Sequence, residues 1–223
     1  MFERLLPADF SVSSADPRVP GGTLYPEEYE LVARAVPKRR REFAKSRECA
    51  HVALGRLGFP AQPLLMGPRR EPLWPEGAVG SITHTDSYCA AAVSRRDRYA
   101  GIGIDAECDE PLPAAVGERV CSREELREFE GAGWAAPGLL AKLAFSAKEA
   151  VYKCLFAEGR ELELERIAIA LREDGGFRAR TAPPDATTRV FEGVWLRGEG
   201  LVLTAVWTVA HHFGAERARA AAT

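Results

Sequence analysis

Helical and strand patterns alternate in large blocks along this chain, and their order limits the folds that it can adopt. The first half has two segments with helical spacing of apolar residues and then three short apolar runs typical of strands, at 26–36, 40–57, 78–83, 88–94 and 99–105. The second half repeats that order, with helices expected at 122–130 and 138–157 and strands at 165–171, 176–180, 188–197 and 201–210. The pattern predicts an α+β fold.

Local signals set the expected boundaries. Pro26 begins the first helix and Pro37 ends it, and the Pro- and Gly-rich segment 60–77 is expected to be a loop. The break at 95–97 suits a hairpin turn between the strands at 88–94 and 99–105. In the second half, Ser122 and Glu125 form a capping-box pattern, and 198–200 (Gly-Glu-Gly) reads as a tight turn.

Composition excludes several classes of protein. A net charge of −2 over 223 residues gives no general attraction to nucleic acid or to acidic membranes, so an anion site must be a local basic cluster. The five cysteines are scattered without a C-x-x-C pair, which indicates neither a zinc site nor a disulfide framework. No signal peptide is evident and no stretch approaches the roughly 20 apolar residues of a membrane span, so we expect a cytoplasmic protein.

Two acidic residues end the strand pattern GIGIDAE at 101–107. Because side chains alternate faces on a strand, Asp105 and Glu107 project to the same side. Two carboxylates that point together favour a hard cation such as Mg²⁺ between them. The alternative is an exposed strand end with two solvated acids.

A second charged group lies on the expected helix FSAKEAVYKCL at 145–155. Glu149 and Lys153 are i, i+4 neighbours there, and Lys148 lies beside them in the sequence. Alone, this pattern is also that of a surface ion pair worth roughly 0.3–0.5 kcal/mol. The ordered combination of the D-x-E strand and this helix about forty residues later is far more specific than either part.

Three blocks in this order resemble the phosphopantetheinyl transferases, in particular the larger two-subdomain type that serves siderophore, peptide and polyketide synthetases. The blocks are REPLWPEGAVGSITH at 70–84, GIGIDAE at 101–107 and FSAKEAVYK at 145–153, and the resemblance covers about 38–157. It implies transfer of the 4′-phosphopantetheine group of coenzyme A to a serine of an apo acyl or peptidyl carrier protein, with release of 3′,5′-ADP. It also implies two similar subdomains in a pseudo-two-fold arrangement, 1–104 and 105–223, with the active site in the cleft between them.

The resemblance assigns roles to the charged residues. Asp105, Glu107 and Glu149 would be ligands of a Mg²⁺ ion, replaceable by Mn²⁺, that holds the coenzyme A diphosphate. Lys153 would steady the charge on that diphosphate, with Lys148 assisting. Glu149 is also the candidate base for the carrier serine, directly or through a water, so it can be a ligand, a base or both.

The expected coenzyme A site lies upstream of the acids. Ser81 and His84 offer hydrogen bonds to phosphate, and the resemblance assigns the 3′-phosphate to the histidine, although a histidine in this position can also be a satisfied core residue. Basic candidates for phosphate are the arginines on one face of the second helix and those before EPLWP, namely Arg40, Arg47, Arg69 and Arg70. The sequence does not decide among them, and a charge run is commonly a solvated face.

Other readings remain open on the sequence. One is a Mg²⁺-dependent phosphotransferase or hydrolase acting on another nucleotide, which lacks support because there is no G-x-x-x-x-G-K-[ST] loop. Others are an inactive coenzyme A or carrier-binding module, and a protein whose acids merely finish a strand and a helix. The carrier is expected to meet a basic surface around Arg119, Arg123 and Arg127, and the two-subdomain length favours a monomer. His211 and His212 are expected at the surface without a role.

Overall fold

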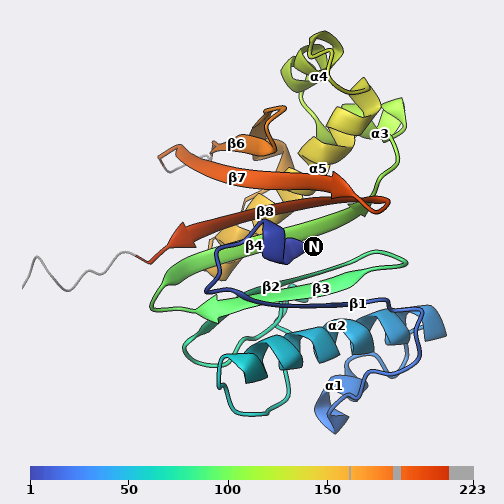
Figure 1. Cartoon of the computed structure of the whole chain (residues 1–223), viewed down its shortest axis with the longest axis vertical. Coiled ribbons are helices and arrows are strands. Elements are labelled where there is room, and N and C mark those ends of the chain that lie inside the picture. The colour runs from blue at the N-terminus through green and yellow to red at the C-terminus, as the bar shows by residue number, and fades with distance from the viewer. Residues whose placement is uncertain (161, 183–186, 211–223) are drawn as a thin grey trace, which may run out of the picture.

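The computed structural model describes residues 1–160, 162–182 and 187–210, and it has an α+β fold with two antiparallel sheets (Figure 1). The first half begins with a 3₁₀ turn at Phe2–Arg4 and continues with β1 (Ser11–Ala15), α1 (Pro26–Glu30), α2 (Pro37–Arg56), β2 (Ala78–His84) and β3 (Cys89–Arg95). Its three strands form one sheet in the order β1-β3-β2.

The second half forms the larger sheet. It contains β4 (Tyr99–Cys108), α3 (Ala114–Val120), α4 (Arg123–Gly131), α5 (Pro137–Ala157), a 3₁₀ turn at Leu164–Arg166, β5 (Ile167–Leu171), β6 (Gly176–Thr181), β7 (Arg189–Gly198) and β8 (Leu201–Val209). These strands are ordered β4-β8-β7-β6-β5. In Figure 1, α2 lies along the three-stranded sheet at one end of the molecule, and α3 and α4 lie at the opposite end.

Most of the expected elements are confirmed, and the capping box and tight turn form as predicted. Glu125 N donates to Ser122 Oγ (3.1 Å) and Ser122 N donates to Glu125 Oε2 (2.6 Å) at the start of α4. Glu199 and Gly200 have φ values of 55° and 74° in the turn between β7 and β8, the left-handed conformation that this hairpin requires. Within the described residues, no helix has both the length and the apolar character needed to cross a bilayer.

Several expectations are corrected. The helix that begins at Pro26 ends at Glu30, well before residue 36, and Pro37 is the first residue of α2 rather than only the end of α1. The turn after β3 does not make a hairpin: β3 pairs with β1 and β2, whereas β4 pairs with β8. The segment Ser11–Ala15 was not expected to be a strand, because three of its five residues are serines and only Val12 is a strong strand former. His211 and His212 lie outside the described residues.

Side-chain hydroxyls on β2 join the two sheets. Ser81 Oγ accepts a hydrogen bond from the Ile104 amide (3.1 Å), and Thr83 Oγ1 accepts one from the Ala106 amide (2.9 Å). These hydroxyls satisfy backbone amides of β4 on the side that faces away from its sheet partner β8. The residue boundary expected at 104/105 therefore falls inside a strand that contacts both halves.

Helix α5 lies unusually close to β4, and two glycines make this contact. An added Cβ at Gly103 would overlap the carbonyl oxygen of Ala150, and one at Gly101 would lie 2.6 Å from the carbonyl oxygen of Cys154. Only glycine permits a helix backbone to approach a strand this closely. The pattern GIGID therefore sets the distance between the strand that carries Asp105 and the helix that carries Glu149.

We expect Gly103→Ala to lower the free energy of unfolding by about 3 kcal/mol, the upper part of the usual range for overpacking, because the new methyl group meets backbone that cannot move aside. Urea unfolding measures this loss. Gly55→Ala is the matched control: nothing lies within 4 Å of an added Cβ in this exposed turn of α2. There the substitution should stabilise the protein by about 0.5–1 kcal/mol. Equal effects at the two positions would contradict the close packing of α5 on β4.

Candidate active site

A cavity of about 740 Å³ lies between the first half of the chain and α5. Its lining comes from α2, the loop after α2, β2 and the second half of α5, and it includes the aromatic side chains of Phe43, Trp74, Tyr152 and Phe156. Six of the residues predicted to bind coenzyme A line it: Arg47, Arg69, Arg70, Ser81, His84 and Lys153. The cavity thus combines an apolar interior with basic groups, which suits a nucleotide with phosphates.

The structure does not bring the other two predicted contacts to this cavity. Arg40 is not among its lining residues, whereas the neighbouring Arg39 is. Lys148 lies in the interior of the second half, where its Nζ donates to Glu125 Oε2 (2.8 Å) and to the Val120 carbonyl (2.8 Å). The lysine side chain is 2% exposed, so a phosphate of a ligand in the cavity does not meet it.

Arg39 is a residue that the sequence reasoning missed. Its Nη1 lies 2.7 Å from His84 Nε2 across the gap between α2 and β2. Arginine can only donate, so Nε2 accepts and the proton of the neutral ring resides on Nδ1. Helical spacing places Arg39 a quarter turn from Arg40 and Arg47, and no sequence signal shows which of these faces β2.

The histidine is held in its neutral form. Burial lowers the pKa of His84, and the adjacent Arg39 guanidinium lowers it further, while Glu42 acts in the opposite direction. A dianionic phosphate at this position would reverse the balance by favouring a second proton on the ring. The pair is therefore suited to bind an anion that arrives from solution.

Arg47 is held by contacts within the cavity wall. Its Nε donates to the Leu64 carbonyl (3.0 Å), and its guanidinium carbon lies 4.4 Å from the Phe43 ring centroid. Burial lowers the pKa of Arg47 to about 10, and Glu28 partly offsets that effect. The residue remains a cation at neutral pH, and these two contacts fix the orientation of its guanidinium group.

The acids on β4 already have lysine partners. Asp105 accepts hydrogen bonds from Lys153 Nζ (2.6 Å) and Ser146 Oγ (2.9 Å). Glu107 accepts one from Lys142 Nζ (3.0 Å). These three partners come from α5, and Thr83 Oγ1 on β2 also donates to Asp105 (3.3 Å). The close packing of α5 on β4 thus brings lysines to both acids.

Glu149 differs from these two acids. Among the described residues its carboxylate has no hydrogen bond or ion pair, although it is half-buried. Burial raises the pKa of Glu149, and the charges of Asp105 and Glu107 raise it further, while Lys153 lowers it. The charges of the three carboxylates therefore act on one another.

These residues fit a Mg²⁺ ion in their chemistry. Carboxylate oxygens are hard donors of the kind that Mg²⁺ takes, and a half-buried carboxylate repelled by two others gains most from a cation. In the described part of the chain, however, no three acidic, histidine or cysteine side chains are gathered closely enough to hold a metal as they stand. A cation held by these carboxylates would compete with the lysines that now contact Asp105 and Glu107.

A second cavity of about 800 Å³ adjoins the first. It shares Arg69 and Tyr152 with the first cavity, and its other lining residues are Glu149 and 162–166. Glu149 thus lines a space next to the basic and aromatic cavity.

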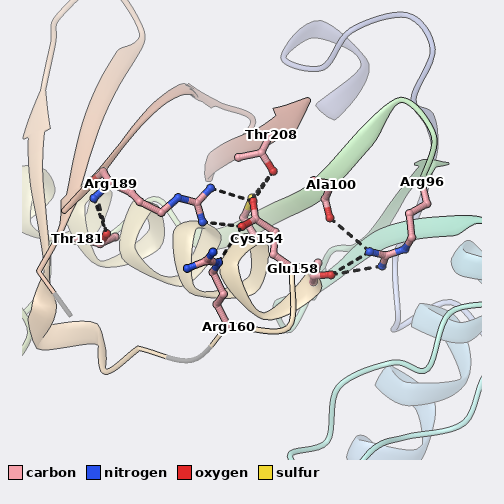
Figure 2. A network of polar contacts seen from close by, with 9 residues as sticks. Arg96, Ala100, Cys154, Glu158, Arg160, Thr181, Arg189 and Thr208 are labelled. Atoms are coloured by element: carbon pink, nitrogen blue, oxygen red, sulfur yellow. Dashed lines mark hydrogen bonds and ion pairs between the residues drawn. The ribbon is translucent and has the colours of Figure 1, made fainter. Parts of the chain in front are cut away.

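The carboxyl end of α5 is fixed from both halves (Figure 2). Arg96, in the turn after β3, donates to the carbonyl oxygen of Ala157 through Nη1 (3.2 Å) and Nη2 (3.3 Å), and it lines the first cavity. On the other side, Glu158 accepts hydrogen bonds from Arg189 Nη1 (2.5 Å) on β7 and Thr208 Oγ1 (2.6 Å) on β8. Arg96 is a further lining residue that the sequence reasoning did not identify.

Comparison with known proteins gives the same family that the three sequence blocks resemble. Residues 27–94 match the 4′-phosphopantetheinyl transferase N-terminal domain, and residues 101–206 match the 4′-phosphopantetheinyl transferase superfamily. The chain is 45% identical over 198 residues to the 4′-phosphopantetheinyl transferase Svp of Streptomyces mobaraensis, covering 85% of this chain and 80% of that protein. It is 40% identical over 203 residues to PptT of Mycobacterium tuberculosis (84% and 87% covered) and 37% identical over 224 residues to Npt of Nocardia iowensis (92% and 99% covered).

The chain therefore belongs to the 4′-phosphopantetheinyl transferase superfamily. It is an enzyme that transfers the 4′-phosphopantetheine group of coenzyme A to a carrier protein. Its substrates are thus coenzyme A and a carrier protein.

Glu149→Gln should abolish transfer and raise stability at neutral pH in the presence of a chelator. The folded state raises the pKa of Glu149, so this side chain favours folding when protonated and that contribution is lost as the pH rises through the raised pKa. Thermal unfolding from pH 4 to pH 8 measures the effect: the variant's advantage should grow with pH. Glu173→Gln, at an exposed position, is the control and should change neither property. A variant less stable than wild type at pH 8 would contradict the electrostatic assignment.

Proposed function

We propose that Asp105, Glu107 and Glu149 hold the Mg²⁺ ion, or Mn²⁺ in its place, on which transfer depends. The observation that carries this proposal is the close packing of α5 on β4, which brings Glu149 near Asp105 and Glu107, whose charges raise the pKa of Glu149. When bound, the cation neutralises charge that builds on the coenzyme A diphosphate as the phosphate bond breaks. Lys153 and Lys142, released from the acids, become available to the same diphosphate oxygens.

The first cavity is the proposed coenzyme A site, with the 3′-phosphate at Arg39 and His84. Arg39 offers forked donors, and the neutral His84 ring gains a proton as the phosphate arrives. The aromatic wall formed by Phe43, Trp74 and Tyr152 supports the adenine ring, and Arg69 and Arg70 lie at the exposed rim. Arg47 packs against the Phe43 ring and so supports this wall. This orientation leaves the diphosphate directed toward Lys153.

Glu149 is the proposed general base. The hydroxyl oxygen of the carrier serine attacks the phosphorus that bears the pantetheine, a new P–O bond forms, and the P–O bond to 3′,5′-ADP breaks. The serine proton passes to Glu149, which lines the second cavity next to the proposed coenzyme A site. Lys153 stabilises the negative charge on the departing 3′,5′-ADP. The second cavity, which Glu149 lines, is the path by which the serine arrives.

The carrier surface and the organisation of the chain are part of the same proposal. Arg119 on α3 and Arg123 and Arg127 on α4 are all exposed, which supports a basic docking surface for an acidic carrier helix. The first cavity takes its walls from both halves of one chain, which supports a monomer whose active site lies between subdomains 1–104 and 105–223. Carriers of siderophore synthesis are among the candidate acceptors, because the chain is also 32% identical over 150 residues to enterobactin synthase component D of Salmonella typhi.

The proposed place of the 3′-phosphate is tested with Arg39→Ala and Arg40→Ala. Loss of hydrogen bonds to a charged group costs about 1.5–3 kcal/mol, so Arg39→Ala should raise the KM for coenzyme A at least about tenfold. Arg40→Ala removes the same charge from outside the cavity and should change this KM less than about twofold. Mass spectrometry of an apo carrier protein incubated with Mg²⁺ follows the transfer.

The same assay with 3′-dephospho-coenzyme A is the control. Here the two variants should behave alike, since the group that Arg39 contacts is missing. A persistent difference would show that Arg39 acts elsewhere in the cavity. Chelation of divalent cations should abolish transfer by the wild type, and undiminished transfer in chelator would exclude the proposed metal dependence.

A further inference from the structure

Two fully buried glutamates, one in each half, have the same surroundings. Glu28 is 0% exposed and Glu125 is 4% exposed, values reached by few acidic side chains in folded proteins. Each is the third residue of the helix that precedes the long helix of its half, Glu28 in α1 and Glu125 in α4. Neither residue lines the cavities described above.

Glu125 joins three elements of the second half. Its Oε2 accepts hydrogen bonds from the Ser122 amide (2.6 Å) and from Lys148 Nζ on α5 (2.8 Å). Its Oε1 accepts one from the Ile169 amide on β5 (2.8 Å). The carboxylate therefore ties the start of α4 to the middle of α5 and to the first strand after it.

Glu28 makes the corresponding contacts in the first half. Its Oε2 accepts a hydrogen bond from the Tyr25 amide (3.0 Å), three residues before it, as Glu125 does from Ser122. Its Oε1 lies 2.8 Å from His51 Nε2 on α2 and accepts a hydrogen bond from the Leu64 amide (2.9 Å). Again one carboxylate ties a short helix, a long helix and the segment that follows the long helix.

The spacing of the paired side chains is identical in the two halves. His51 follows Glu28 by 23 residues, and Lys148 follows Glu125 by 23 residues. The partner changes from histidine to lysine, so the repeat is invisible as a sequence motif and is recognised only from the contacts. Each half thus contains the same set of contacts around one buried glutamate, and we call the sets made by Glu28 and Glu125 the two braces.

Each brace holds a different part of the active site. Leu64 lies in the loop after α2, which together with α2 supplies Arg39, Arg69 and Trp74 to the first cavity. Lys148 directly precedes Glu149 on α5, and Ile169 closely follows 162–166, the segment that lines the second cavity with Glu149. Glu28 therefore supports the proposed coenzyme A site, and Glu125 supports the proposed base.

We propose that Glu28 and Glu125 are paired positioning residues with separate effects on the reaction. Glu28 fixes α2 and its following loop and so governs coenzyme A binding. Glu125, through Lys148, fixes the turn of α5 that carries Glu149 and so governs the chemical step. The inference rests on the proposed roles of the first cavity and of Glu149.

The physical basis is the rigidity of a buried, fully bonded carboxylate. Both oxygens of each glutamate are engaged, and each has a charged or ring partner as well as backbone amides. Glutamine keeps the shape but replaces one acceptor oxygen by an NH₂ group, which faces a donor and cannot bond to it. A small displacement of a catalytic group is enough to slow the reaction strongly.

The test compares Glu28→Gln with Glu125→Gln in the full-length enzyme, with a saturating apo carrier and Mg²⁺. We expect Glu28→Gln to raise the KM for coenzyme A about tenfold with kcat within about twofold of wild type. We expect the reverse for Glu125→Gln, in which kcat falls about tenfold and the KM for coenzyme A stays within about twofold. A loss of folded enzyme alone would lower the apparent kcat of both variants and leave the KM for coenzyme A unchanged, so it cannot produce the rise in KM expected for Glu28→Gln.

A double variant separates positioning from stability. Glu125→Gln alone leaves the Lys148 charge buried without its partner, whereas Glu125→Gln with Lys148→Met removes both charges and should recover much of the lost thermal stability. The kcat should nevertheless stay low, because the contact between α4 and α5 remains broken. Recovery of kcat together with stability would overturn the proposal for Glu125.

A second variant tests the same contact if Glu125→Gln does not fold. Glu125→Asp keeps the charge but withdraws the carboxylate from Lys148, so it should show the same loss of kcat. The proposal is overturned if Glu28→Gln and Glu125→Gln change kcat and the KM for coenzyme A by the same factors while the wild type transfers normally. Absence of transfer by the wild type with several apo carriers would instead contradict the proposed function itself.

Discussion

The active site depends on the contact between α5 and β4. Gly101 and Gly103 let the helix lie directly on the strand, where any side chain would overlap the carbonyl oxygens of Cys154 and Ala150. This contact sets the acids of β4 against the acid and lysines of α5. The charge balance of the site follows from it, and the rest of the second half packs around the same helix.

Charge balance is the second consequence of this contact. Lys153 and Lys142 neutralise Asp105 and Glu107, while Glu149 has no such partner among the described residues. Without the lysines, acids packed this close would repel one another and oppose folding. In the proposed function, a bound cation and diphosphate would take the place of these lysines. The proposed braces at Glu28 and Glu125 would keep the surrounding helices in place during that exchange.

Much of this could be predicted from sequence, for identifiable reasons. The helices α2 and α5 and the strands β4 and β8 have clear periodicity, and the D-x-E and K-E-x-x-x-K patterns place acids and lysine on defined faces. The features that the sequence did not predict depend on contacts between distant segments. The pairing of β4 with β8 instead of β3, the position of Arg39 opposite His84, and the burial of Lys148 against Glu125 are each fixed by tertiary packing. The glycines in GIGID are evident in the sequence, but only the position of α5 shows that Gly101 and Gly103 allow its close packing on β4.

The most direct test of the central claim is the position of the metal. Crystals of the enzyme with coenzyme A and Mn²⁺, measured for anomalous scattering, locate the ion without assumptions about side-chain roles. We expect one strong peak bounded by carboxylate oxygens of Asp105, Glu107 and Glu149, with the Lys153–Asp105 and Lys142–Glu107 contacts broken. A peak away from Glu149, or an ordered coenzyme A with both lysine contacts retained and no peak, would contradict it.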